Sequence, residues 1–248
     1  MDERKQKNCI NEIINISSIS KAFSTRSVLN NISFNVTEGQ SVSICGPNGV
    51  GKSTLLRITA GLLQPDNGLV RICGHDIRKD PEKAKPLLGV ISHKSMIYSN
   101  LTVFENLSFF GTLYGIEDKN DRIKVTLDDL GLSGYRYDKA EALSRGMLQR
   151  LAIARALLHQ PKVLLADEPF TGLDSEASEH LISVLTNFTS HGGTIIMTTH
   201  DINNGLKCSD RIVVLDKGRL IFDEMKNDIN NIAFARDYLS YARNERKT

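Results

Sequence analysis

The pattern of apolar and polar positions divides the chain into short strands and helices. Two alternating runs, at 12–23 and 27–40, predict antiparallel strands with a turn at Glu38-Gly39. Beyond them, apolar runs alternate with segments of helical period, which predicts an α/β fold: a mainly parallel sheet with helices on both faces. Further strands are expected at 42–45, 69–74, 87–92, 162–167, 193–200 and 210–222, and helices at 52–60, 176–190 and 202–208.

Residues 101–160 break this alternation, because mostly helical patterns follow one another there. A helical block inserted into a sheet domain is the expected place for a function beyond the core. The predicted organisation is one domain over 12–242, with an α/β core at 12–92 and 161–225, a helical subdomain at 93–160, and flexible tails at 1–11 and 243–248. A length of 248 residues suits one such domain.

Composition and charge narrow the class of protein only a little. The chain has 31 basic and 29 acidic residues, and this balance argues neither for nor against a nucleic-acid partner. Four scattered cysteines without a C-x-x-C pair indicate reduced thiols rather than a disulfide framework or a zinc site. The first residues are polar and charged, unlike a signal peptide, and no stretch approaches 18 uninterrupted apolar residues. We therefore expect a chain that does not span a membrane by itself.

The stretch SICGPNGVGKSTLLRI, residues 43–58, carries the first chemical motif. The spacing G-x-x-x-x-G-K-S lies between a predicted strand and a predicted helix, where backbone N–H groups can hold phosphate. In this motif Lys52 reaches the β and γ phosphates of a nucleoside triphosphate, and Ser53 ligates Mg²⁺. The competing interpretation, a glycine-rich turn that merely caps a helix, leaves the lysine and serine unexplained. The predicted phosphate-loop residues are Gly46, Pro47, Asn48, Gly49, Val50, Gly51, Lys52, Ser53 and Thr54.

A second group of polar residues follows the predicted strands at 162–167 and 193–200. Asp167 ends an apolar strand, and strand ends are where open α/β sheets bind ligands, so it is a candidate to hold Mg²⁺. Glu168 could then orient and deprotonate the attacking water. His200 could reach the γ phosphate if its strand neighbours that of Asp167. Alternatively, these residues only end strands in solvent.

The stretch LSRGMLQRLAIARALL, 143–158, predicts a helix capped by Ser144, with its inner face formed by Leu151, Ala154, Leu157 and Leu158. A capped helix with a glycine in its first turn is a second possible anion site. The sequence pattern alone is equally consistent with an ordinary amphipathic helix.

Taken together, the motifs resemble those of the nucleotide-binding subunit of ABC transporters, over about residues 12–225 and in the family's order. The resemblance identifies 143–147 as the signature segment and Gly172-Leu173-Asp174 as the D-loop. It implies a P-loop NTPase fold with an antiparallel β subdomain, a mainly parallel core and an inserted helical subdomain. The residues that it assigns to the signature segment are Leu143, Ser144, Arg145, Gly146 and Met147.

The resemblance also implies a mechanism and partners. Asp167 corresponds to the magnesium-site aspartate, Glu168 to the catalytic glutamate, and His200 to the switch histidine. Phe23 lies where the family has an aromatic ring that stacks on adenine, although it could instead be a core residue of its strand. Two subunits would pack head to tail, so that Ser144 acts in trans on the partner's ATP. The expected setting is a peripheral position on the cytoplasmic membrane face, bound to an integral membrane permease, with Mg²⁺ and ATP and without nucleic acid.

The sequence departs from the family's pattern at two places. The usual signature is LSGGQ, whereas Arg145 and Met147 replace its first glycine and its glutamine here. His93 stands where the family usually has a glutamine that touches Mg²⁺ and the water. Imidazole is a poorer ligand for Mg²⁺ than an amide oxygen, so a metal contact by His93 is in doubt.

Longer stretches of the sequence bear on the subfamily and on the cargo. The runs from Ile91 to Gly115, from Leu143 to Asp174 and from Thr198 to Leu220 together resemble the ATP-binding subunit of the haem exporter of cytochrome c maturation. Multidrug, polysaccharide and antibiotic exporters share parts of these sequence stretches. A soluble ABC ATPase switch, such as one in iron–sulfur assembly, is a further alternative. An ordinary small-molecule kinase would leave the signature segment unexplained.

Overall fold

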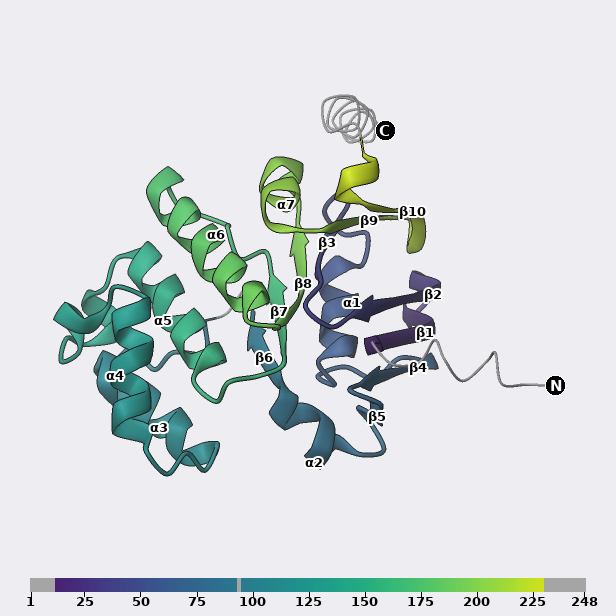
Figure 1. The fold of residues 1–248 in the computed structure, drawn as a ribbon. Helices are drawn as coiled ribbons and strands as arrows, with labels where there is room; N and C mark the ends of the chain where they lie inside the picture. The colour runs from purple at the N-terminus through teal and green to yellow at the C-terminus, as the bar shows by residue number, and fades with distance from the viewer. Residues whose placement is uncertain (1–11, 93–94, 230–248) are drawn as a thin grey trace.

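The computed structural model describes residues 12–92 and 95–229, in which the strands form two sheets (Figure 1). The smaller sheet is antiparallel and has the strand order β2-β1-β4-β5. Its strands are β1 (Glu12–Phe23), β2 (Arg26–Thr37), β4 (Asn67–Ile72) and β5 (His75–Asp76). Alternate side chains of β2 are buried, which is the pattern of a sheet with one face on the core.

The larger sheet has the order β10-β9-β3-β8-β7-β6 in the described part of the chain. Neighbouring strands are parallel, except that β9 and β10 form an antiparallel pair. The strands are β3 (Ser41–Cys45), β6 (Leu88–Ile91), β7 (Val163–Asp167), β8 (Thr194–Thr199), β9 (Arg211–Asp216) and β10 (Arg219–Met225). The central strands β3 and β8 are buried along their whole length, as parallel strands covered on both faces must be.

Three of the helices lie together, apart from the antiparallel sheet. Figure 1 shows α3, α4 and α5 gathered on the opposite side of the larger sheet from β1, β2 and β4. The helices are α1 (Lys52–Thr59), α2 (Pro81–Ala84), α3 (Val103–Leu113), α4 (Lys119–Asp129), α5 (Arg145–Leu157), α6 (Ser175–Ser190) and α7 (Ile202–Cys208). Short 3-10 turns lie at Lys85–Leu87, Ser133–Tyr135, Ala140–Ala142 and Lys226–Asp228.

Strand β7 separates the two larger of the three apolar cores in the described part of the chain. Val163 and Leu165 pack into a core shared with the antiparallel sheet and α1, whereas Leu164 and Ala166 pack into a core shared with the helices α3–α6. This follows from the alternation of side chains along a strand. As a result, the end of β7 is fixed from both faces, and Asp167 leaves the sheet at a well-determined point.

Polar caps fix where several helices begin. Thr102 and Glu105 form a capping box on α3, and the side chains of Ser144, Asp174 and Asp201 accept bonds from first-turn N–H groups of α5, α6 and α7. Each such cap contributes about 1 kcal/mol to stability. The caps on α5 and α6 set the positions of the signature segment and the D-loop.

The predicted fold class is confirmed, with several local differences. The predicted turn at Glu38-Gly39 is confirmed and follows β2, while a further turn at Ser24 and Thr25 joins β1 to β2. Strand β4 begins at Asn67 rather than at residue 69, because Asn67 pairs with Ser20 of β1. The short elements α2 and β5 were not predicted. Leu157 is only half-buried, since it lies at the rim of a cavity between α4, α5 and α6.

The proposed division into core and helical subdomains remains a prediction, although α3, α4 and α5 do pack on one another. The predicted tails at 1–11 and 243–248 lie outside the described residues. Among the helices of the described part, none is long and apolar enough to cross a bilayer.

Candidate nucleotide site

The phosphate loop joins β3 to α1 and depends on its glycines. At Gly46, a Cβ would lie 2.4 Å from the carbonyl oxygen of Leu215, too close for any side chain. Gly51 precedes α1 at φ 110°, in a region that favours glycine, and no side chain caps the helix there. The first N–H groups of α1 therefore remain open to an anion.

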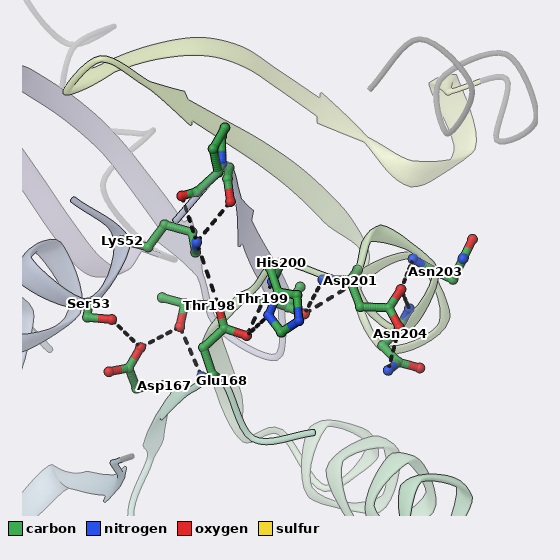
Figure 2. Close-up of polar contacts among 12 residues, drawn as sticks. Lys52, Ser53, Asp167, Glu168, Thr198, Thr199, His200, Asp201, Asn203 and Asn204 are labelled. Atoms are coloured by element: carbon green, nitrogen blue, oxygen red, sulfur yellow. Dashed lines mark hydrogen bonds and ion pairs between the residues drawn. The ribbon is translucent and has the colours of Figure 1, made fainter. Parts of the chain in front are cut away.

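Lys52 lies in the loop with its ammonium group held against the backbone. Its Nζ donates to the carbonyl oxygens of Gly46 at 2.8 Å and Pro47 at 3.1 Å, and it lies 3.6 Å from Oε1 of Glu168 (Figure 2). The side chain is only 6% exposed. A buried cation is stable only when it is well paired. The ammonium group of Lys52 can therefore exchange the carbonyl oxygens of the loop for phosphate oxygens, which are stronger partners.

Oxygen ligands for a hard cation gather where β7 ends. Both Ser53 Oγ, at 2.8 Å, and Thr198 Oγ1, at 2.6 Å, donate to Oδ1 of Asp167. A hydroxyl beside a carboxylate suits Mg²⁺, which binds proteins through one or two carboxylates and takes its remaining ligands from phosphates and water. Across residues 12–92 and 95–229, no group of three or more His, Cys, Asp or Glu side chains could hold a metal ion by itself. Ser53 and Asp167 therefore fit Mg²⁺ delivered with a nucleotide.

Glu168 is held between two cationic or potentially cationic groups. Its Oε2 lies 2.6 Å from Nδ1 of His200, and its Oε1 faces Lys52 (Figure 2). Its backbone N–H donates to the carbonyl and hydroxyl oxygens of Thr198, which holds the residue at φ 51°. A non-glycine residue in this region costs of the order of 1 kcal/mol and is concentrated at functional sites.

One cleft of about 610 Å³ brings together most of the residues predicted to bind ATP, along with Glu168 and His200. That volume is typical of a site for a small organic ligand. Its lining includes Phe23, Arg26, Val28, Asn48, Gly49, Gly51, Lys52, Ser53, Thr54, Glu168, Thr171 and His200. Asp167 lies beside this cleft, in a smaller cavity that shares Glu168 and Thr171 with it. The geometry thus places an aromatic ring, a phosphate loop, a carboxylate and an imidazole around one space.

Phe23 is not a core residue, because it is 48% exposed at the end of β1.

We expect Phe23→Ala to weaken ATP binding modestly, by about fivefold, because it removes a ring on which adenine can stack. Isothermal titration calorimetry measures the affinity, and the melting temperature should stay unchanged. Phe34→Ala is the matched control, since Phe34 is 7% exposed and should lower the melting temperature instead. Unfolding of the Phe23 variant would contradict this assignment.

The signature segment does not line the cleft of its own chain. Ser144 caps α5 by accepting a 3.3 Å bond from the N–H of Met147, so its hydroxyl and Gly146 lie at the N-terminus of this helix. Leu143 is buried beneath them. Asp174 likewise caps α6 through Ala177. The position of Ser144 outside the cleft agrees with the predicted action in trans, which remains a prediction.

His93, the predicted substitute for the usual glutamine, lies outside the described residues.

The family is shown by sequence comparison. Residues 29–171 match the family described as ABC transporter. The chain belongs to the ABC transporter family. It is an ATP-binding subunit of that family, and its enzyme class is that of the ABC ATPases.

Curated relatives of this ABC subunit carry several kinds of name. The linearmycin resistance ATP-binding protein LnrL of Bacillus subtilis (strain 168) is 34% identical over 85% of this chain and 68% of its own length. The Nod factor export ATP-binding protein I of Ralstonia nicotianae is 34% identical over 84% and 66%. The spermidine/putrescine import ATP-binding protein PotA of Bacteroides fragilis is 35% identical over 84% and 46%. The chain therefore spans about half of PotA and about two thirds of LnrL and of the Nod factor export protein.

Solved structures give the same picture. The structure of an ATP-binding subunit of an ABC transporter superposes with a TM-score of 0.82 at 27% identity, covering 95% of this chain and 100% of that chain. The dimeric, post-hydrolysis ATP-binding cassette MJ0796 bound to ADP and Pi superposes with a TM-score of 0.80 at 30% identity, covering 87% of this chain and 100% of that chain. The fold assigned to this ABC subunit is thus confirmed.

The sequence did not predict Thr198, which contacts both Asp167 and Glu168 in this ABC subunit. It donates to Asp167 and accepts the N–H of Glu168. The available signal was the pairing of β7 with β8, which places Asp167 opposite Thr198. Sequence spacing within either strand does not contain that register.

Cys45, at the end of β3, lies next to the phosphate loop but offers no reactive group. Burial raises the pKa of its thiol to about 12. The thiol therefore remains protonated, and because only the thiolate is a good nucleophile, Cys45 takes no part in the chemistry.

Proposed function

We propose that this chain is the ATP-hydrolysing motor subunit of a transporter, binding Mg-ATP in the cleft between Phe23 and the phosphate loop. The observation that carries the proposal is the arrangement of Lys52, Glu168 and His200 around one cleft, in a chain that belongs to the ABC family. A phosphate loop, a cation and a carboxylate base are the parts that phosphoryl transfer to water requires.

The proposed chemistry uses few residues. Lys52 leaves the carbonyl oxygens of its loop and pairs with the β and γ phosphates. This frees Glu168, whose carboxylate orients a water molecule and accepts its proton as the water attacks the γ phosphorus. The bond from the γ phosphorus to the bridging oxygen breaks, and ADP and inorganic phosphate leave. His200 holds Glu168 from the other side and reaches the γ phosphate. When bound between Ser53 and Asp167, Mg²⁺ would neutralise charge on the phosphate oxygens.

Two copies of the chain are proposed to close head to tail over two ATP molecules. Dimerisation is a property of ABC cassettes, as the dimeric MJ0796 cassette illustrates. The free N-terminus of α5, with Ser144 and Gly146, then meets the γ phosphate on the partner's loop, because a helix N-terminus attracts anions. ATP stabilises the closed pair and hydrolysis loosens it, which is how binding energy becomes movement.

The partner is proposed to be an integral membrane permease, with this chain peripheral on its cytoplasmic face. For the cargo we favour export of an antibiotic, a drug or a similar molecule, because LnrL and the Nod factor protein are named for resistance and export. Haem export, to which parts of the sequence point, has no support from these relatives. The name of PotA keeps import as the competing direction.

A native-membrane pull-down tests the transport proposal. The Glu168→Gln chain is incubated with membranes and Mg-ATP, and co-purified proteins are identified by mass spectrometry, with haem monitored by absorbance. Recovery of a multi-spanning permease supports the motor. Recovery of soluble partners alone overturns it and favours a soluble ATP switch, such as one in iron–sulfur assembly. A haem-containing complex overturns the cargo proposed here.

A further inference from the structure

Arg145, which replaces a glycine of the usual signature, covers Gly172 of the D-loop with its guanidinium group. A Cβ built on Gly172 would lie 2.1 Å from Cζ and 2.5 Å from both Nε and Nη1. Because conjugated C–N bonds are about 1.33 Å long, these distances place the Cβ position almost directly above the central carbon. The flat face of the guanidinium therefore lies against the backbone of Gly172.

A second contact lies one helical turn further along α5. Gln149 donates through Nε2 to the carbonyl oxygen of Pro169 at 3.0 Å. Positions 145 and 149 share one helix face, since residues four apart are neighbours on a helix. The start of α5 thus contacts the segment 168–174, here named the Glu168 loop, at two points.

The contact of Arg145 depends on packing rather than on an ion pair. Among the described residues, the ion pairs of the structure do not include the Arg145 guanidinium. Gly172 itself adopts φ 76°, which also favours glycine. The backbone angle of Gly172 therefore favours glycine, and a methyl group at this position would also have to displace the guanidinium of Arg145.

Both ends of the Glu168 loop are fixed by other contacts. Glu168 is bound through Thr198 and His200, and Asp174 caps α6. Between them, Gly172 is exposed and lacks a side chain. Within the loop, the N–H groups of Thr171 and Leu173 donate to carbonyl oxygens of the same loop. The guanidinium of Arg145 packs on Gly172, so α5 adds a contact to the middle of the loop.

We propose that Arg145 is a positioning residue that acts within its own chain: its guanidinium face fixes Gly172 and thereby holds the loop that carries Glu168. The inference rests on the proposed function, in which α5 binds the partner's ATP. When the two subunits close over ATP, α5 moves, and its contact through Arg145 moves the Glu168 loop of the same chain. The nucleotide in one site would thus influence the base that acts in the other.

The test is a kinetic double-mutant cycle on the full chain with Mg-ATP. We expect Arg145→Ala to lower kcat about tenfold with little change in KM, because the base is misplaced while the phosphate loop is intact. Gly172→Ala alone should also cost about tenfold, because its methyl group displaces the guanidinium. In the Arg145→Ala background, Gly172→Ala should lower kcat only about threefold, since the effects of substitutions at contacting residues are not additive. Lys124→Ala, on the exposed surface of α4, is the unchanged control.

Arg145→Lys separates packing from charge. A lysine keeps the charge but has no planar face, so it should resemble Arg145→Ala. Wild-type kcat in the lysine variant, or additive effects in the cycle, would overturn the proposal.

Thermal unfolding of the same four proteins provides a readout that needs no catalysis. Non-additive melting temperatures support the contact even if the chain hydrolyses no ATP, in which case the proposed function fails and the positioning contact stands. Additive melting temperatures together with additive kcat values overturn the contact while the proposed function stands.

Discussion

Glu168→Gln is expected to stop steady-state ATP hydrolysis while leaving ATP bound. The amide keeps the shape of the carboxylate and can still contact Lys52 or His200, but it cannot accept a proton from the attacking water. Loss of a general base lowers turnover by about 100-fold or more. Phosphate release measures the rate, and equilibrium binding of a fluorescent ATP analogue measures the affinity.

Glu179→Gln provides the matched control, since Glu179 is an exposed carboxylate of α6. Its turnover should equal that of the wild type. A Glu168→Gln variant that hydrolyses ATP at the wild-type rate would show that another group is the base. A variant that no longer binds ATP would show that Glu168 supports the nucleotide site rather than the chemistry.

Lys52→Ala is expected to weaken ATP binding by about 100-fold, because it removes a charge-assisted contact to the phosphates. The lysine is buried and pairs with the carbonyl oxygens of Gly46 and Pro47, so the free protein also loses two hydrogen bonds. Calorimetric titration with ATP measures the affinity, and circular dichroism checks that the domain is folded.

Lys207→Ala, at an exposed position in α7, removes the same charge without touching the cleft. It should bind ATP as the wild type does. Unchanged ATP affinity in a folded Lys52→Ala protein would mean that the ammonium group does not contact the phosphates.

The sequence was sufficient for the parts of the site that lie close together along the chain. The phosphate loop could be predicted because a strand, a glycine-rich turn and a helix follow one another directly between 42 and 60. Asp167 and Glu168 could be predicted because an apolar strand ends there. The predicted closeness of His200 to these residues followed from the expected neighbouring of two strands, and β7 and β8 are indeed paired.

The contacts that the sequence did not predict join segments that are far apart. Thr198 reaches Asp167 only because of the register between two strands 31 positions apart. Arg145 and Gly172 meet only because α5 packs on the loop after β7. Neither contact has a signal in local composition or period, since both depend on tertiary packing.

Two copies of this chain are proposed to close over ATP, and the molar mass of the Glu168→Gln protein in solution tests this pairing directly. Light scattering coupled to size-exclusion chromatography measures it with and without Mg-ATP. We expect the mass of one chain, 27.5 kDa, without nucleotide and twice that mass with Mg-ATP. A protein that binds ATP at saturation and still elutes as a single chain would contradict the head-to-tail pair and the role given to Ser144 in trans.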